Sequence, residues 1–171
     1  MLGLQSVRTN WQFRPGARRI IPSVRRKVEL PTMKKLPKSL YDRVKISLEK
    51  GNEFLDGDRS DRALEEFERA LGFIPEPRDD YEVTYEVLAA IGDVHWFNED
   101  FEKALETFES AQKIFGAAHQ HYQPFLLLRI GQCCYELEDE ERARTLLKMG
   151  LEAIGADLFE EEDPKYLELV S

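Results

Sequence analysis

The sequence predicts an all-α protein, a right-handed superhelical solenoid of three helix hairpins with a short C-terminal capping helix. The first observation is a repeated set of small and apolar residues: Gly51, Ala63, Phe67 and Ala70; Gly92, Ala104, Phe108 and Ala111; and, more loosely, Gly131, Ala143, Leu147 and Gly150. The second is that the interval from the glycine to the first alanine is the same in all three copies. The third is that turn residues divide each copy into two segments with helical spacing of apolar residues. Self-similarity at an interval of about 40 residues indicates a solenoid.

The first hairpin is expected at about residues 40–75. Ser39 is a candidate N-cap for its first helix, because a serine side chain accepts a hydrogen bond from a free backbone N–H group at the helix start. The turn is expected at residues 56–58, which read Asp-Gly-Asp. Ser60 or Asp61 should then cap the second helix.

The second and third hairpins are expected at about residues 81–116 and 122–155. Their helices are predicted at residues 79–97, 101–115, 124–137 and 140–154. Residues 156–171 should form the cap, because a terminal repeat has no neighbour to cover its outer side.

Residues 1–36 differ in composition from the rest of the chain. Residues 1–40 contain ten Lys or Arg and a single acid, Glu29. We interpret residues 1–36 as a basic, disordered arm, as a segment that resembles an organelle transit peptide, or as an extension upstream of a true start at Met33. The folded domain is expected at residues 37–171.

The charge balance limits the kinds of partner. The whole chain has a formal net charge of -9, and because its N-terminal 40 residues are basic, residues 41–171 are more acidic still. Nucleic acid is therefore a poor partner for the repeat domain. No apolar run reaches the roughly 20 residues of a membrane-spanning helix. The adjacent Cys133 and Cys134 cannot easily form a disulfide, which favours a cytoplasmic location.

The repeated residues resemble the tetratricopeptide repeat family. That family has a Leu-Gly pair in its first helix and an Ala, Phe, Ala set in its second, matched here by Ile91-Gly92 and by Ala104, Phe108 and Ala111. The departures are Lys50 before the first glycine, and Leu147 and Gly150 in the third copy. The similarity covers about residues 40–154. Residues 159–166 also resemble a stretch in small, acidic bacterial members that act as immunity partners of toxins or as secretion chaperones.

The resemblance implies a non-catalytic module that binds a protein or peptide on its concave face, as an adaptor, a chaperone or a toxin-neutralising partner. The alternative is a scaffold attached to a membrane or to nucleic acid through the basic arm. We expect no catalytic residue, small-molecule substrate, cofactor or metal ion, since no phosphate-binding glycine loop or catalytic triad is present. The sequence leaves the oligomeric state open.

Ten residues are predicted to contact the partner: nine occupy outward positions of the first helix in each hairpin, and Arg129 matches a basic position in one peptide-binding subclass of the family. They are Asn52 and Leu55; Glu86, Asp93, Trp96 and Phe97; and Phe125, Arg129, Gln132 and Tyr135. Exposed aromatic residues are typical binding hot spots, and acids favour a partner with basic and apolar groups. One subclass of the family grips a C-terminal carboxylate with basic side chains. Only Asn52 and Arg129 match its pattern, so we disfavour that mode.

Three other features have simpler explanations than a functional site. His119 and His121 lie close in sequence, but no third metal ligand is evident nearby, so we interpret them as loop residues. The two cysteines are predicted in mid-helix on an apolar face, where core packing is a better explanation than a nucleophile. Residues 160–163, which read Glu-Glu-Glu-Asp, are an acidic loop that is either solvated or a docking patch for a basic partner.

Overall fold

The computed structural model of the protein describes residues 33–119 and 122–171. Within these ranges the chain is all-helical, with seven α-helices, two short 3-10 helices and no strand beyond a single isolated β-bridge. The predicted helical class is therefore confirmed. The expectations for residues 1–32 and for His121 lie outside the described residues.

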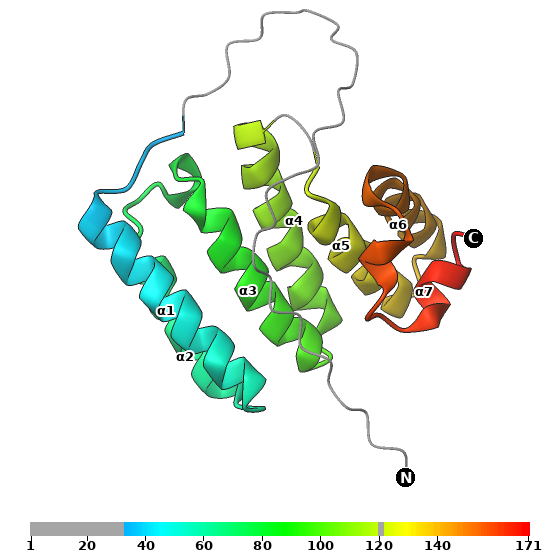
Figure 1. Cartoon of the computed structure of the whole chain (residues 1–171), viewed down its shortest axis with the longest axis horizontal. Helices are drawn as coiled ribbons and strands as arrows, with labels where there is room; N and C mark the ends of the chain where they lie inside the picture. Colours follow the sequence, from blue (N-terminus) through cyan, green and yellow to red (C-terminus); the bar gives the residue numbers. More distant parts are fainter. Residues whose placement is uncertain (1–32, 120–121) are drawn as a thin grey trace, which may run out of the picture.

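The helices pack as three consecutive pairs. The pairs are α1 (Lys38–Asp56) with α2 (Ser60–Gly72), α3 (Val83–Phe97) with α4 (Phe101–His119), and α5 (Pro124–Glu136) with α6 (Glu140–Ile154). Neighbouring pairs contact each other mainly through α2 and α3, and through α4 and α5. Figure 1 shows the pairs in a row from left to right.

Two short segments complete the described chain. The 3-10 helix η1 (Arg78–Asp80) lies between the first and second pairs. After α6, the 3-10 helix η2 (Ala156–Phe159) and the short helix α7 (Pro164–Glu168) lie at the right-hand end of the row, against the third pair (Figure 1).

One close contact recurs in every pair, between the glycine of the first helix and a large side chain of the second. A Cβ atom added to the glycine would lie 2.2 Å from Phe67 for Gly51, 2.6 Å from Phe108 for Gly92 and 2.8 Å from Leu147 for Gly131. All three large side chains are fully buried. Because real Cβ atoms do not approach other atoms this closely, only glycine allows the two helices their present separation.

Several helix boundaries differ from the prediction. The N-cap of α1 is Pro37 rather than Ser39, which lies inside the first turn, and the N-cap of α2 is Arg59. Helix α3 begins later than expected, at Val83, because η1 forms a separate turn before it. That turn is held by the Thr84 hydroxyl, which donates to the Arg78 carbonyl over 2.7 Å. Helix α4 extends four residues beyond the predicted end, to His119.

Residues 33–36, assigned to the arm from their composition, contact the helical domain. The backbone N–H of Lys34 donates to the Asp80 carbonyl over 2.7 Å, and the Lys34 ammonium pairs with the Asp80 carboxylate over 2.5 Å. Leu36 is partly buried against the core between the first two pairs. The folded part of the chain therefore begins before residue 37. Composition could not show this, because it does not reveal which residues Lys34 and Leu36 contact.

Replacing Gly92 by Ala should destabilise the protein by about 1–3 kcal/mol, because the added methyl group overlaps the buried Phe108 ring. The control is Gly72→Ala, since a Cβ there meets no atom within 4 Å. That change should leave stability unaltered or raise it by up to about 1 kcal/mol, because alanine is the better helix former. Urea unfolding followed by circular dichroism measures both. Equal effects of the two changes would contradict the close-contact model.

A chain that begins at residue 37 should melt several degrees below one that begins at residue 33. The shorter chain loses the Lys34 backbone hydrogen bond and the packing of Leu36, together about 1–2 kcal/mol. Differential scanning calorimetry of the two truncated chains tests this. Identical melting temperatures would show that residues 33–36 contribute nothing to the fold.

Candidate functional site

We call the outward side of α1, α3 and α5 the A face. It includes the ten residues predicted to contact a partner. On α1, side chains spaced by three and four residues share this side of the helix, so Tyr41 belongs with Lys45, Asn52 and Leu55. Helices α1 and α3 contact each other directly along it.

The structure divides the ten predicted residues into accessible and buried groups. Asn52 and Phe97 are exposed, and Leu55, Glu86, Trp96, Tyr135 and, with less exposure, Asp93 are half-buried. Phe125, Arg129 and Gln132 are buried, with at most 7% of their surface exposed. The expected exposure of these three is wrong, because other parts of the chain cover them.

The first half of the A face, on α1 and α3, is open. Lys45 of α1 forms an ion pair with Glu86 of α3 over 2.7 Å, and both side chains remain partly exposed. Burial alone would lower the pKa of Lys45. The hydrogen bond to Glu86 and the negative charge of Glu86 outweigh this effect, so the pKa of Lys45 is raised. Phe97 is 42% exposed and Tyr41 is 41% exposed. This half therefore offers aromatic and charged groups to solvent.

The second half of the A face is organised around Arg129. Its guanidinium Nε donates to Asp93 Oδ1 over 3.0 Å, and Nη1 donates to Gln132 Oε1 over 2.9 Å. The guanidinium carbon also lies 5.0 Å from the centre of the Phe125 ring and 5.8 Å from that of Trp96. Arg129 thus connects α3 to α5 through a buried ion pair.

The C-terminal segment completes this cluster. Glu162, which precedes α7, accepts a hydrogen bond from Gln132 Nε2 over 2.8 Å and one from Arg129 Nη1 over 3.2 Å. Tyr166 of α7 packs against Trp96 and Tyr135, with ring centres 6.3 Å and 5.6 Å apart, and its hydroxyl donates to Glu136 over 2.6 Å. The acidic residues 160–163 are therefore not simply solvated, because one of them lies in the Arg129 cluster.

Residues 85–116 match the family model for the tetratricopeptide repeat. The second helix pair is therefore a tetratricopeptide repeat. The match covers most of α3 and α4, which form the second helix pair and contain the Gly92–Phe108 contact. Comparison with curated proteins finds no match. No helix of the described residues is long and apolar enough to cross a membrane.

Sequence reasoning missed Glu162 and Tyr166 as parts of the A face. A signal was present: Arg129 is the only charged residue in the otherwise apolar stretch 125–131, and a buried arginine requires acidic partners. The partners could not be chosen without the fold, since Asp93 and Glu162 lie 36 and 33 residues away in sequence.

Asp93 has a different environment from the one predicted. It was expected to face a partner, but its side chain is only 17% exposed and it pairs with Arg129. Burial raises the pKa of Asp93 to about 6, against the lowering effect of Arg129 and with a further contribution from the Glu162 charge. Two carboxylates thus share one guanidinium in a largely dry cluster.

The two cysteines are buried in the core, and His119 interacts with a glutamate at the N-terminal end of α3. Cys133 and Cys134 are fully buried free thiols, and burial raises the pKa of the Cys133 thiol to about 12, so it stays protonated at neutral pH. His119 Nε2 lies 2.7 Å from Glu82 Oε1. Among residues 33–119 and 122–171, no group of three His, Cys, Asp or Glu residues is placed to hold a metal ion.

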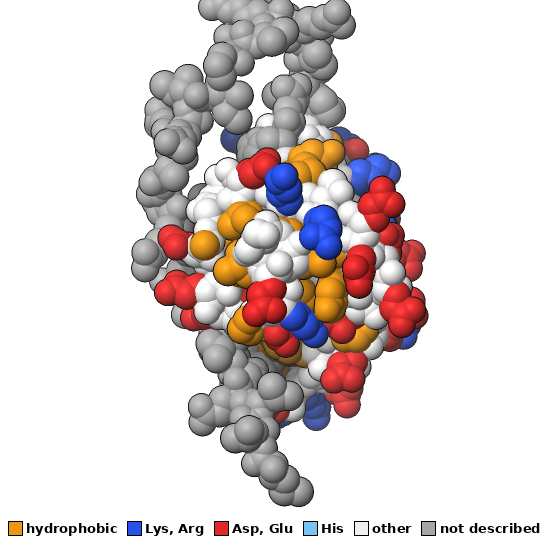
Figure 2. Space-filling view, turned by 90° about the vertical axis from the view of Figure 1, so that its right-hand side faces the viewer, with side chains coloured by type: hydrophobic (Ala, Val, Ile, Leu, Met, Phe, Trp, Pro, Cys, Tyr) orange, Lys and Arg blue, Asp and Glu red, His pale blue; other side chains and the backbone are white. Residues whose placement is uncertain are grey.

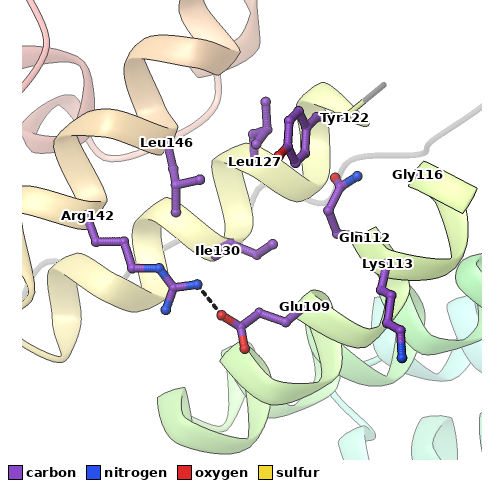
Figure 3. A pocket seen from close by; sticks show the side chains of 9 residues that line it. All are labelled: Glu109, Gln112, Lys113, Gly116, Tyr122, Leu127, Ile130, Arg142 and Leu146. Atoms are coloured by element: carbon purple, nitrogen blue, oxygen red, sulfur yellow. Dashed lines mark hydrogen bonds and ion pairs between the residues drawn. The ribbon is translucent and has the colours of Figure 1, made fainter. Parts of the chain in front are cut away.

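An open groove of about 640 Å³ lies between α4 and α6, over α5, and none of the ten predicted residues lines it. Figure 3 shows Leu127 and Ile130 of α5 between the two outer helices, with Glu109 of α4 and Arg142 of α6 joined by an ion pair across it. The groove is therefore a surface between second helices, separate from the A face.

The C-terminal end of the row has no continuous apolar surface on the side that Figure 2 shows. Hydrophobic side chains there are interspersed with acidic and basic ones (Figure 2). Leu158, Phe159 and Tyr166 are buried against Leu128 and Leu147 of the third pair. Residues 156–171 thus cover apolar surface that a further repeat would otherwise cover.

Changing Asp93 to Asn should alter how stability depends on pH. The folded-state pKa of Asp93 is raised to about 6 from 3.8, so the folded wild-type chain takes up a proton as pH falls through 6, and the unfolded chain does so only near 4. This group therefore makes the wild type relatively more stable as pH falls from 7 to 4, by on the order of 2 kcal/mol. The Asp93→Asn chain lacks this gain, so its stability relative to wild type should fall over the same range.

The control is Asp100→Asn. The hydrogen bond from Lys103 lowers the pKa of Asp100. The ionised Asp100 carboxylate therefore stabilises the folded chain above about pH 4, and this stabilisation is lost as pH falls further, the opposite of the trend for Asp93. Chemical unfolding at several pH values measures both differences. A constant difference between the Asp93→Asn chain and wild type from pH 7 to 4 would contradict the buried position of Asp93.

Proposed function

We propose that this tetratricopeptide repeat chain is a non-catalytic protein-binding module, a right-handed solenoid of three hairpins whose partner lies along the A face. The observation that supports the proposal most is the open half of that face on α1 and α3. There Tyr41 lies one helical turn before Lys45 of the Lys45–Glu86 ion pair, whose groups remain partly in solvent, and Phe97 is exposed at the opposite end of α3. Exposed aromatic groups beside charges are typical of protein interfaces.

The chemistry of the open half favours a partner with apolar and basic groups. Phe97 and Leu55 offer apolar area, and Asp56 and Glu86 offer carboxylates at the end of α1 and the start of α3. A basic partner group could take the place of Lys45 beside Glu86, since that pair is partly exposed and contributes little to stability. Adaptor, chaperone and toxin-neutralising roles all use such a surface.

The setting we propose is the cytoplasm. Both cysteines are free thiols buried in the core, and free thiols persist in a reducing compartment. The proposal needs no catalytic group, since its only requirement is a surface that a partner can cover.

Changing Phe97 to Ala should weaken partner binding by about 2 kcal/mol, roughly thirty-fold in Kd, because an aromatic anchor loses its contact area. The partner is first captured from a lysate with the immobilised full chain, then purified and measured by calorimetry. The control is Tyr122→Ala, an exposed aromatic residue beside the groove between α4 and α6. A stronger effect of the Tyr122 change would place the interface in that groove instead.

A charge reversal on the same face should act mainly on association. Glu86→Lys should slow binding and weaken its salt dependence, because rim charges steer the encounter of two proteins. Glu106→Lys, at an exposed position of α4, is the matched control. Equal effects on the association rate would indicate that only net charge matters, which contradicts a defined interface on the A face.

A further inference from the structure

A short segment at the C-terminus lies on the A face in the way a bound peptide would. It consists of residues 160–168 and follows η2 in Figure 1, where it runs towards the red end of the chain. It contacts α5 through Glu162 and Tyr166, and it contacts α3 through Tyr166. Its hydrogen bonds to α5 join side chains 30 or more residues apart in sequence.

The position that receives the Glu162 carboxylate is preorganised. Gln132 is fully buried, and its Oε1 accepts from Arg129, which leaves Nε2 directed at Glu162. Arg129 is itself oriented by Asp93 over 3.0 Å. A guanidinium and an amide held in this way form a built site for one carboxylate, since hydrogen bonds to a charged acceptor are strong and geometrically specific.

A second position receives an aromatic ring four residues later. Tyr166 lies between Trp96 and Tyr135, is 3% exposed, and donates its hydroxyl proton to Glu136. Lys165 also pairs with Glu136, over 2.8 Å. The two positions together recognise a carboxylate followed, four residues later, by an aromatic side chain within a short helix.

We propose that Arg129, Gln132, Trp96 and Tyr135 form a peptide-binding site whose resident occupant is the chain's own segment 160–168. An acidic segment of a partner protein, with a carboxylate and an aromatic ring at the same spacing, binds there by displacing it. This deepens the proposed function, and rests on it, by naming the kind of peptide that the second half of the A face accepts.

The geometry of the segment allows such an exchange. Leu158 and Phe159 are buried in the third pair and can keep the segment attached. Within residues 160–168, only Tyr166 is buried, whereas acids such as Glu161 are exposed. The displaceable part is therefore short and largely solvated.

The test uses a fluorescently labelled synthetic peptide of residues 157–168 and the full chain, with binding followed by anisotropy. The wild-type chain should bind the peptide weakly, because its own segment occupies the site. Glu162→Gln in the chain should bind the peptide at least ten-fold more tightly, because the loss of a charge-assisted hydrogen bond weakens the resident segment. The control chain is Glu161→Gln. Glu161 is next to Glu162 in sequence, but its side chain is exposed, so this change should leave the affinity at the wild-type value.

Two further arms define the site. A peptide with Glu162→Gln should bind the Glu162→Gln chain at least ten-fold more weakly than the unaltered peptide. Arg129→Lys in that chain should remove most of this preference, because lysine cannot supply the guanidinium geometry. Circular dichroism confirms that each chain is folded. Where Arg129→Lys is not folded, the comparison of the two peptides still tests the proposal.

The proposal is overturned by any of three results: no peptide binding to a folded Glu162→Gln chain, equal affinity for both peptides, or equal effects of the Glu161 and Glu162 changes. These outcomes are separate from those for the proposed function. If Phe97→Ala abolishes partner binding while the peptide fails to bind, only the displacement model is wrong. If the peptide binds as expected while Phe97→Ala has no effect on the partner, the open half is not the interface.

Discussion

The close contact between a glycine of the first helix and a large side chain of the second sets the geometry of the whole molecule. Gly51, Gly92 and Gly131 each leave space for Phe67, Phe108 or Leu147, and an added Cβ would lie within 3 Å of that side chain in every pair. The smallest separation of the two helices in each pair is therefore set by van der Waals repulsion, which rises steeply as the atoms approach each other. A fixed pair repeated three times aligns α1, α3 and α5, and this alignment creates the A face.

The two halves of the A face differ in how exposed their ion pairs between consecutive first helices are. Lys45–Glu86 joins α1 to α3 in partial contact with water, so it is weak and exchangeable. Arg129–Asp93 joins α3 to α5 in a nearly dry environment, where removal of one partner would leave a buried charge unpaired and cost about 3–5 kcal/mol. An ion pair between first helices is thus accessible to solvent in one half of the A face and buried in the other, where it holds α3 and α5 together. Glu162 adds a second carboxylate to the rigid half, at the end of the row where no fourth pair follows among the described residues.

The helical architecture was predictable because its determinants are local and repeated. The glycine-to-alanine interval and the apolar spacing appear within each hairpin, and errors were limited to helix ends such as Ser39, where a proline supplied the N-cap instead. The site was less predictable, because burial on the A face depends on where residues 156–171 pack. Phe125, Arg129 and Gln132 occupy outward positions of α5, and helical periodicity alone assigns such positions to solvent. The C-terminal segment reverses that assignment for Arg129 and Gln132, whereas Phe125 is buried in the core with residues of α4.

A tethered occupant determines what kind of partner can bind the second half of the A face. A segment joined to α6 by a few residues has an effective concentration on the order of millimolar at its own site, far above that of most free proteins. A partner peptide with contacts equal to those of residues 160–168 would therefore displace them only at a comparable concentration. It gains the required affinity only if it also contacts groups that the resident segment does not reach, and Phe97, Glu86 and Asn52 in the open half are such groups. In the proposed displacement model, the two halves would together favour a partner long enough to extend from α5 to α1, and short acidic segments that match the carboxylate site alone would bind weakly.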